Sequence, residues 1–528
     1  MAGISPYAGT WTKNHVQHLL KRTLVGYKSD YLNPFNGLTM AQCVTKVLTP
    51  LASELSPSAP VNDYQNSDAP ASNDATVTYG QPWLNVYDND NFTVRYLRGI
   101  SLHNWQLKQC INQPETILQK MILFWLNHIP VGLNEVDDAS HFYNYMNIFR
   151  QNAVGNFKTI IKEIAIAPSM LRYLNGANNT NIAPDENFAR ELMELFTIGK
   201  SDNANYTEED VRQAAKVLTG YRITNYTSFF STGLHDTSTK TFSAFFNNTV
   251  INGQTTVAGM EQELDALLTM IFSNDEVAKF ICRKIYRYFV YYKIDAAVEN
   301  DVITPLATIF RSNNYQITPV LEALFKSEHF YDNLVDSAVI KPPIDFLVGY
   351  CKEMKLTFPT DIGTDFKITG LFSYISDNLQ QDIFNPPNVS GFPAYYQAPQ
   401  FHEIWINTFT YKTRVDFSKW ILWGGYTQDD FTLKVNLLDW VLQFNNINNP
   451  NLLIDQIANY FYALPVSTEF KLSLKDNLLS GQQQDYYWSV AWDNYMTNPT
   501  DMTNQNNVLY KLGGLLSQIF SQPEYQLS

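Results

Sequence analysis

Apolar residues recur at helical spacing along most of the chain, and clusters of Ser, Asn, Asp, Pro and Gly separate the periodic segments. In residues 185–199, the clearest example, Asp185 stands at an N-cap position and Gly199 at a C′ position. The large apolar residues of this segment, at i, i+4, i+7 and i+8, are Phe188, Leu192, Leu195 and Phe196. Residues 207–220 repeat the pattern behind a capping box. A period of 3.6 residues predicts amphipathic helices with one face in a core.

Similar runs predict helices on both sides of this pair. A first helix is expected at 11–26, and the apolar run 121–126 predicts a helix that is buried on every side. Pro168 predicts a boundary within 159–175, because proline inside a helix costs about 3 kcal/mol. The remaining helical segments are 260–272, 276–291, 303–310, 320–325, 433–444 and 452–465.

One segment breaks the helical period. In residues 224–256, Thr, Asn and Phe dominate and glycines bracket the run, which predicts a small β-hairpin insertion. The expected fold is therefore mainly α, with a multi-helical, bundle-like core and long polar loops. A chain of 528 residues exceeds the size of most single cores. The expected parts are an N-terminal helical segment (1–54), a polar linker or loop (55–91), a helical core that contains the insertion (92–340), and a C-terminal helical region with Asn/Gln-rich loops (341–528).

Composition narrows the range of partners. Hydrophobic residues make up 45% of the chain and charged residues only 17%, so uncharged polar groups must cover much of the surface. The formal net charge of −14 repels phosphate backbones and anionic headgroups. Binding to nucleic acid is therefore disfavoured.

Cysteine spacing and the apolar runs bear on the cellular setting. The four cysteines form no C-x-x-C pair, which argues against a zinc knuckle or a disulfide framework. The sequence shows neither a signal-peptide pattern nor an apolar run of about 18 residues, so no membrane span is expected. The expected location is cytoplasmic by default, with export by another route or through a removed leader as the alternative.

Familiar catalytic motifs are missing. The chain contains neither a G-x-S-x-G elbow nor a G-x-G-x-x-G loop. Gly199-Lys200-Ser201 is similar to the end of a P-loop, but Glu194 stands where that motif needs its first glycine. These patterns exclude the usual serine-hydrolase, dinucleotide-binding and P-loop NTPase classes.

Seven motifs together resemble one family, the bacterial domain of unknown function 1800 family. They are HLLKRTLVG, W-x-N-H at 125–128, APSMLRYL, DENFARELMELFTIG, YTEEDVRQAAKVLTGY, H-D-x-x-x-K at 235–240 and NPPNVSGFP. Each is weak alone, but their order over roughly residues 15–415 is specific.

The resemblance implies a mostly helical bacterial protein that is often exported and often encoded beside a sulfatase-like partner, with no established reaction. The chain departs from the family pattern at three places. It has Asp185 where members usually have Asn, Tyr221 where they have Trp, and Gly391-Phe392-Pro393-Ala394-Tyr395 where they have Gly-Trp-Pro-Gly-Gly.

The polar face of 185–199 is the first candidate site. Glu186, Arg190 and Glu194 step by four residues, and Glu191 lies beside them. Carboxylates on one helical face can ligate a hard cation or act as general acid and base. The alternative is a solvated ladder of i,i+4 ion pairs, each contributing only about 0.3–0.5 kcal/mol.

The second candidate is the loop that carries His235, Asp236 and Lys240. An aspartate can orient an imidazole, and a lysine can stabilise an oxyanion, so this trio suits a metal site or an anion site. The resemblance aligns His235 and Lys240 with motif positions. The alternative is an Asx turn at Asp236 with Lys240 in water.

Other residues are assigned to the core. His128 follows the buried 121–126 run and is interpreted as a satisfied core or C-terminal capping histidine. Aromatic clusters at 395–396, 420–426 and 486–492 suit stacking on sugar rings, but core packing is the more common role of such residues.

Two hypotheses follow for an uncharacterised bacterial protein. In the first, the 185–199 helix, the 235–240 loop and His128 form one polar cleft of a metal-assisted hydrolase. Its metal ligands, for a divalent ion, are Glu191, Glu194, His235 and Asp236, and its catalytic candidates are Glu186, Arg190, Glu191, Glu194, His235 and Lys240. In the second, the protein binds glycans or takes part in cell-envelope assembly without catalysis.

Overall fold

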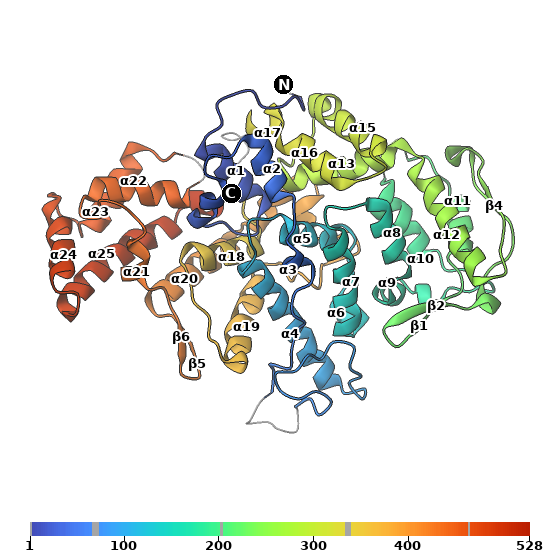
Figure 1. Ribbon diagram of the computed structural model, residues 1–528, viewed down its shortest axis with the longest axis horizontal. Helices are drawn as coiled ribbons and strands as arrows, with labels where there is room; N and C mark the ends of the chain where they lie inside the picture. Colours follow the sequence, from blue (N-terminus) through green and yellow to red (C-terminus); the bar gives the residue numbers. More distant parts are fainter. Residues whose placement is uncertain (1–2, 66–72, 201–203, 333–338, 463–464) are drawn as a thin grey trace.

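Helices build nearly the whole protein, as Figure 1 shows for the computed structural model. The structure describes residues 3–65, 73–200, 204–332, 339–462 and 465–528. Both chain ends lie near the middle of an elongated body, with α22 to α25 at one end and the β1–β4 region at the other (Figure 1). The predicted mainly α class is confirmed.

The first helices surround the middle of the body. Their bounds are α1 Lys13–Thr23, α2 Met40–Val47, α3 Ala52–Leu55, α4 Phe92–Ile111, α5 Leu118–His128, α6 Leu133–Val136, α7 Ala139–Asn152, α8 Phe157–Ile166 and α9 Pro168–Tyr173. Pro168 is the first residue of α9, so the predicted boundary is confirmed. Residues 118–126 of α5 are all buried, as its apolar run predicts.

The 185–199 segment is helical but not regular. Helix α10 (Asn187–Glu191) continues into a π-helix (Leu192–Thr197), in which Ile198 N–H donates to the carbonyl of Met193. Leu195 is half-buried, whereas the other apolar residues of the π-helix, Leu192, Met193 and Phe196, are buried. The capping box of α11 (Glu208–Val217) forms at Thr207 as predicted.

In the part of the chain that the structure describes, three two-stranded antiparallel sheets lie beside the helices. Strand β1 (Tyr221–Thr224) pairs with β2 (Thr227–Phe230), with Tyr221 opposite Phe230. A second pair, β3 (Lys240–Thr241) with β4 (Val250–Ile251), completes the insertion. The insertion thus begins at Tyr221 and contains two hairpins, not one. A third hairpin, β5 (Tyr426–Gln428) with β6 (Phe431–Leu433), was not among the elements expected from the sequence.

Of the remaining helices, α13 and α15 to α17 lie along the top in Figure 1, α12 lies at the β1–β4 end, α18 and α19 lie in the middle, and α21 to α25 form the other end. Their bounds are α12 Val257–Phe272, α13 Asp275–Phe289, α14 Ala296–Val298, α15 Thr304–Ser312, α16 Ile317–Phe325, α17 Glu328–Asp332, α18 Pro343–Glu353, α19 Ile362–Asn378, α20 Thr408–Trp423, α21 Leu437–Val441, α22 Pro450–Phe461, α23 Thr468–Leu478, α24 Tyr486–Thr497 and α25 Met502–Phe520. The predicted helix over 433–444 is shorter, because its first residue closes β6.

Most buried hydrophobic side chains form one continuous core that reaches from Val16 to Tyr525, and a second, small cluster contains Phe392, Ala394 and Trp405. The polar segment 55–91 is attached to this core through Trp83, which is fully buried. Arg98 of α4 holds the same segment by a 2.7 Å ion pair with the buried Asp74. The polar segment is therefore packed against α4 at both positions.

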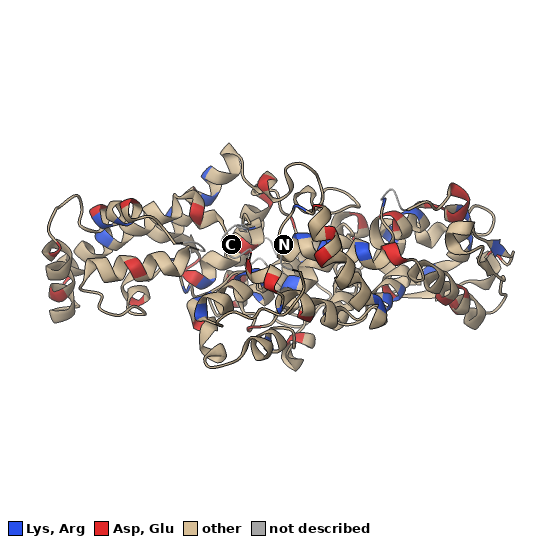
Figure 2. Cartoon of the chain, turned by 90° about the horizontal axis from the view of Figure 1, so that it is seen from above, with Lys and Arg blue, Asp and Glu red and all other residues tan. Residues whose placement is uncertain are grey.

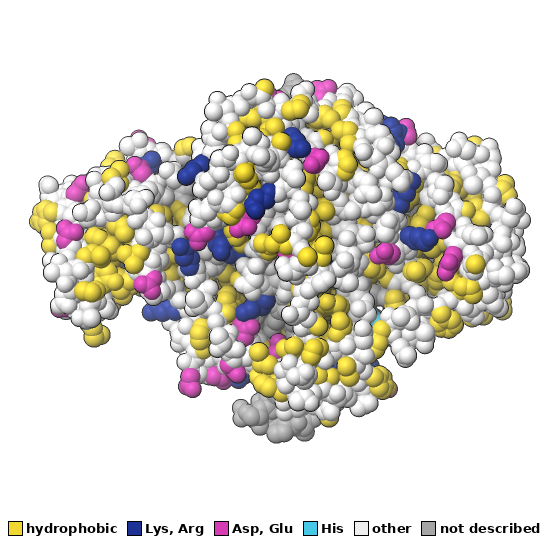
Figure 3. Space-filling view, in the orientation of Figure 1, with side chains coloured by type: hydrophobic (Ala, Val, Ile, Leu, Met, Phe, Trp, Pro, Cys, Tyr) yellow, Lys and Arg dark blue, Asp and Glu magenta, His cyan; other side chains and the backbone are white. Residues whose placement is uncertain are grey.

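Charged groups are sparse on the surface. Figure 2 shows Lys, Arg, Asp and Glu scattered along the whole length, without a strong one-sided field. Figure 3 shows a face that is mostly uncharged, with patches of hydrophobic side chains. Within the described residues, no helix combines the length and the apolar character needed to cross a bilayer.

Candidate functional site

The polar face of the 185–199 segment is an ion-pair ladder at the surface. Arg190 lies 3.0 Å from Glu186, 3.5 Å from Glu194 and 2.6 Å from Glu208. Lys200 adds a second cation beside Glu194. Burial and then repulsion from Glu194 raise the pKa of Glu191. Arg190 and Lys200 thus pair with Glu186, Glu194 and Glu208, as in the ladder alternative, whereas no ion pair of Glu191 is present among the described residues.

His235 and Lys240 do come together, around a carboxylate that sequence patterns do not reveal. The His235 Nε2 atom lies 3.0 Å from one oxygen of Glu263, and the Lys240 ammonium lies 2.6 Å from the other. These three residues, here called the His235 cluster, are each no more than 2% exposed.

The hydrogen-bonding capacity of the His235 cluster is used within the protein. The His235 Nδ1 atom lies 3.0 Å from the carbonyl of Thr219, and Glu263 also accepts from the backbone of Gln254. Hydrogen bonds from His235 and Lys240 overcome the effect of burial and lower the pKa of Glu263. The cluster therefore pins α12 to the 235–240 loop.

The side chain of Asp236 does not take part in the His235 cluster. Its carboxylate accepts from the backbone and the hydroxyl of Ser238, which is the Asx turn foreseen as an alternative. The same alternative is wrong for Lys240, which is fully buried and begins β3, so it faces Glu263 and not water.

His128 lies among aromatic rings and contacts the 185–199 segment. Its Nε2 atom is 3.0 Å from the carbonyl of Phe196, while Nδ1 has no partner. Burial lowers the pKa of His128 to about 3, so the ring is neutral. This histidine links α5 to the π-helix.

The surface ladder and the His235 cluster are separate groups. Among the residues that the structure describes, no hydrogen bond or ion pair joins them. Over the same residues, no group of three or more His, Cys, Asp and Glu side chains is placed to hold a metal ion. A shared cleft and a bound metal ion therefore stay predictions.

A large groove lies away from both the surface ladder and the His235 cluster. Residues 92–103 of α4, 133–139 around α6, 370–377 of α19 and the 382–385 loop line a groove of about 600 Å³. We call it the α4–α19 groove, after the two helices that run side by side in Figure 1. It continues into hollows of about 350 Å³ and about 330 Å³, because neighbouring hollows share lining residues.

Hydrogen-bond acceptors dominate the polar wall of the groove. Four carboxylates line it, and they are Asp137, Asp138, Asp377 and Asp382. The one arginine on this wall, Arg95, already lies within 4 Å of three aspartates, Asp88, Asp90 and Asp137. The wall is therefore acidic overall.

His103 adds a further acceptor. Its Nδ1 lies 2.7 Å from the hydroxyl of Ser373, and that hydroxyl donates to Asn104 at 2.8 Å. Because the hydroxyl has only one proton, Nδ1 must be the donor, which leaves Nε2 unprotonated in the neutral ring. Burial lowers the pKa of His103, against the opposing effect of Asp382. Nε2 then has a free lone pair and lies 3.7 Å from the carboxylate of Asp382.

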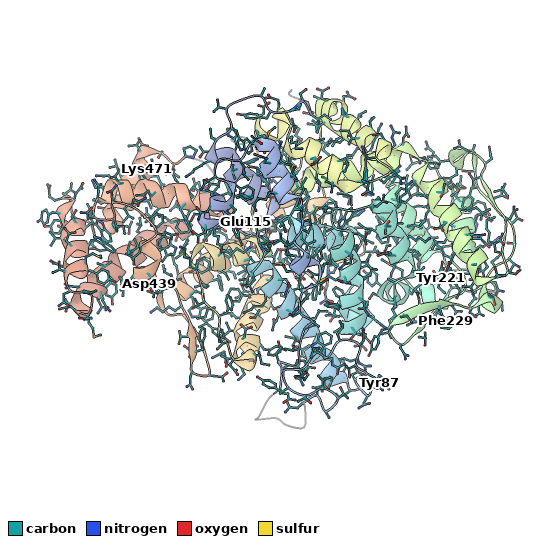
Figure 4. All side chains as sticks on the ribbon, viewed as in Figure 1. Tyr87, Glu115, Tyr221, Phe229, Asp439 and Lys471 are labelled. Atoms are coloured by element: carbon teal, nitrogen blue, oxygen red, sulfur yellow. The ribbon has the colours of Figure 1, made fainter. Side chains whose placement is uncertain are left out.

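Three aromatic side chains stand open at the groove. The exposed fractions of Phe92, Tyr96 and Tyr374 are 70%, 61% and 65%. Tyr87, labelled in Figure 4 in the loop before α4, lines the adjoining hollow and is 58% exposed. Rings that keep their faces in water at a concave site are available for a ligand.

Two family-like motifs hold one rim of the groove. The Asn127 side chain accepts from the backbone of Phe392 at 2.7 Å. Gly391 has φ +85° and leaves no room for a Cβ against Asn127. The start of α6 is tied to the same loop, since Leu133 N–H donates to Phe384 and Asn134 N–H to Asn385. These motifs position the loop that lines the groove.

Sequence reasoning missed both Glu263 and the aromatic residues of the groove. Glu263 lies on an ordinary amphipathic helix, so no local pattern marks its pairing with His235. Phe92 and Tyr96 did carry a signal, because an i,i+4 aromatic pair on one helix face is available as a patch when the core does not bury it. His103 follows on the same face, at i+7 from Tyr96.

Comparisons with known proteins add the family. Neither the curated proteins nor the solved structures contain a match to this chain. The profile described as "Protein of unknown function (DUF1800)" matches residues 18–527. Because that match covers nearly the whole chain, the protein belongs to the DUF1800 family.

Proposed function

We propose that the protein binds a hydroxyl-rich glycan in the α4–α19 groove. The observation that supports this most is the combination of three exposed aromatic rings with a wall of acceptors around about 600 Å³. Sugar rings present apolar C–H faces to aromatic side chains, and their hydroxyl groups donate hydrogen bonds to carboxylates. The binding hypothesis drawn from the sequence is thus moved to a different surface.

The charge of the wall sets the ligand class. Four carboxylates against one already paired arginine disfavour sulfated, phosphorylated or uronic-acid-rich polymers. Neutral or amino sugars fit, because an ammonium group gains from the same field. The hollows that continue from the groove favour a chain of several sugar units over a monosaccharide.

A panel of immobilised neutral, amino and acidic oligosaccharides tests this proposal. We expect the wild-type protein to bind neutral or amino members, and the Tyr96→Ala/Tyr374→Ala double variant to bind at least about tenfold more weakly, from about 1–3 kcal/mol of lost contact. Tyr510→Ala is the matched control, since Tyr510 is 70% exposed on α25 and lies outside the groove. Binding that is lost equally in the control, or selective binding of acidic glycans, contradicts the proposal.

Hydrolysis of the bound ligand is a second candidate function. The free Nε2 of His103, 3.7 Å from Asp382, is placed to accept a proton from water or a hydroxyl. A metal-assisted form of hydrolysis lacks comparable support. We expect His103→Gln to keep ligand binding and to abolish release of reducing ends. Unchanged release in that variant removes His103 from the mechanism.

Two partner expectations remain proposals. The family resemblance suggests a sulfatase-like partner protein, and the net charge suggests that nucleic acid is not bound. Co-purification with a co-expressed sulfatase-like protein tests the first. A DNA and RNA retardation assay at low salt tests the second.

A further inference from the structure

A second cavity lies at the centre of the molecule, apart from the α4–α19 groove. It has a volume of about 30 Å³ and lies between α1, α5, α13 and α18 and the 392–405 segment. Its charged lining residues are Lys21, Arg22, Lys120, Arg287 and Asp345. In a protein of net charge −14, this gathering of cations around a small interior space needs an explanation.

Two hydrogen-bond donors at this cavity have no acceptor. Trp405 is only 3% exposed, and its indole N–H makes no hydrogen bond. The Nδ1 atom of His402 accepts from the backbone of Ile340, so its proton is on Nε2, which is also unpartnered. A buried donor without an acceptor costs about 1–3 kcal/mol, which an anion in the cavity relieves.

Two of these cations, Lys21 and Arg287, make only weak hydrogen bonds. The Lys21 ammonium makes one long hydrogen bond, 3.4 Å from the carbonyl of Tyr462, and Arg287 makes a similar one with Tyr292. Neither joins an ion pair among the described residues. Burial, followed by repulsion from Lys341, lowers the pKa of Lys21 to about 7.

Asp345 gives the site its selectivity. One of its carboxylate oxygens pairs with Lys120, while the other, Oδ1, is buried without a hydrogen bond. An oxyanion that carries no proton would meet repulsion there. An oxyanion with one hydroxyl can donate to Oδ1 and still accept from Trp405 and His402.

We propose that this cavity binds a small oxyanion that retains a proton, with hydrogen phosphate as the best fit. Its oxygens accept from Lys21, Arg287, His402 and Trp405, and its hydroxyl donates to Asp345. We expect this small space to admit a free ion and to exclude a bulky phosphate ester. Because Trp405 also lines the hollow of about 330 Å³ at the end of the groove, the ion site adjoins that end.

Isothermal titration with inorganic phosphate, sulfate and phenyl phosphate tests this proposal on the full chain. We expect phosphate to bind at one site, and sulfate and phenyl phosphate to bind at least tenfold more weakly. Trp405→Phe removes the donor and keeps the ring, so phosphate affinity should fall about tenfold or more. Trp420→Phe is the control, because Trp420 is 41% exposed and outside the cavity.

Four results would each contradict the proposed anion site. No heat with phosphate, equal binding of sulfate, binding of phenyl phosphate as tight as phosphate, or unchanged affinity in Trp405→Phe overturns the site. Asp345→Asn, where it folds, should admit sulfate. If it does not fold, the Trp405→Phe result still separates a built site from a cavity that holds only water.

Discussion

The His235 cluster and the α4–α19 groove contain the same kinds of side chain in opposite settings. In the cluster, one histidine, one lysine and one glutamate are each no more than 2% exposed, and the histidine and the lysine both pair with the glutamate. In the groove, a histidine and several aspartates keep acceptors directed at a hollow of about 600 Å³. Residue type therefore does not distinguish a structural network from a binding site. Access and unused hydrogen-bonding capacity do.

Removing the carboxylate of the cluster should have the largest effect. We expect Glu263→Ala to lower the free energy of unfolding by about 3–5 kcal/mol, because it leaves the buried Lys240 ammonium uncompensated. Urea denaturation followed by circular dichroism measures this. Glu261→Ala, an exposed glutamate on the same helix, is the control and should change stability little. Equal effects in the two variants would show that the cluster is not a structural anchor.

The rim of the groove should be the next most sensitive position. Gly391 has a left-handed φ of +85°, and a Cβ there overlaps the backbone of Asn127. We expect Gly391→Ala to cost on the order of 1–3 kcal/mol and to weaken glycan binding, since the loop it fixes lines the groove. Thermal unfolding and the oligosaccharide panel report the two effects. An alanine variant with full stability and full binding would refute the role assigned to this loop.

Acid should weaken the contribution of the His235 cluster to the stability of the fold. The pKa of Glu263 is lower in the folded protein than its ordinary value, so its contribution to stability is present above the ordinary value. That contribution is lost as pH falls through the folded value. We expect the stability difference between wild type and Glu263→Gln to shrink on acidification below about pH 4.5. A difference that grows in acid reverses the sign of this linkage.

The surface ladder should show the smallest effect. Arg190 is partly exposed and shared among Glu186, Glu194 and Glu208, so Arg190→Ala should cost no more than about 1 kcal/mol. Salt should reduce the loss further. Denaturation at low and high ionic strength checks both statements. A loss of more than about 3 kcal/mol in the free energy of unfolding would show that the ladder stabilises the fold as strongly as a buried ion-pair network.

Local signals predicted much of the fold. The capping box at Thr207 and the proline at the start of α9 act within a few residues, so their sequence patterns translate directly into helix ends. The π-helix at 192–197 was not predictable, because the apolar spacing of a regular helix is nearly the same. The β5–β6 hairpin was missed although Phe431-Thr432-Leu433 alternates, because a run of three residues is too short to be separated from the helical segment expected at 433–444.

The functional surface depended on tertiary structure. His235 and Lys240 were found from their motif, but their partner Glu263 comes from a helix whose sequence shows only amphipathic spacing. Exposure of Tyr374 depends on how α19 lies against α4, which no local pattern encodes. Sequence therefore located reactive residue types without showing which of them are accessible.

Hydrogen–deuterium exchange with and without a bound oligosaccharide tests the central claim most directly. The ligand should slow exchange in peptides from residues 92–103, 370–378 and 382–393, and leave residues 186–194 and 235–263 unchanged. Protection confined to the 186–194 and 235–263 peptides would contradict the assignment of the groove as the functional site.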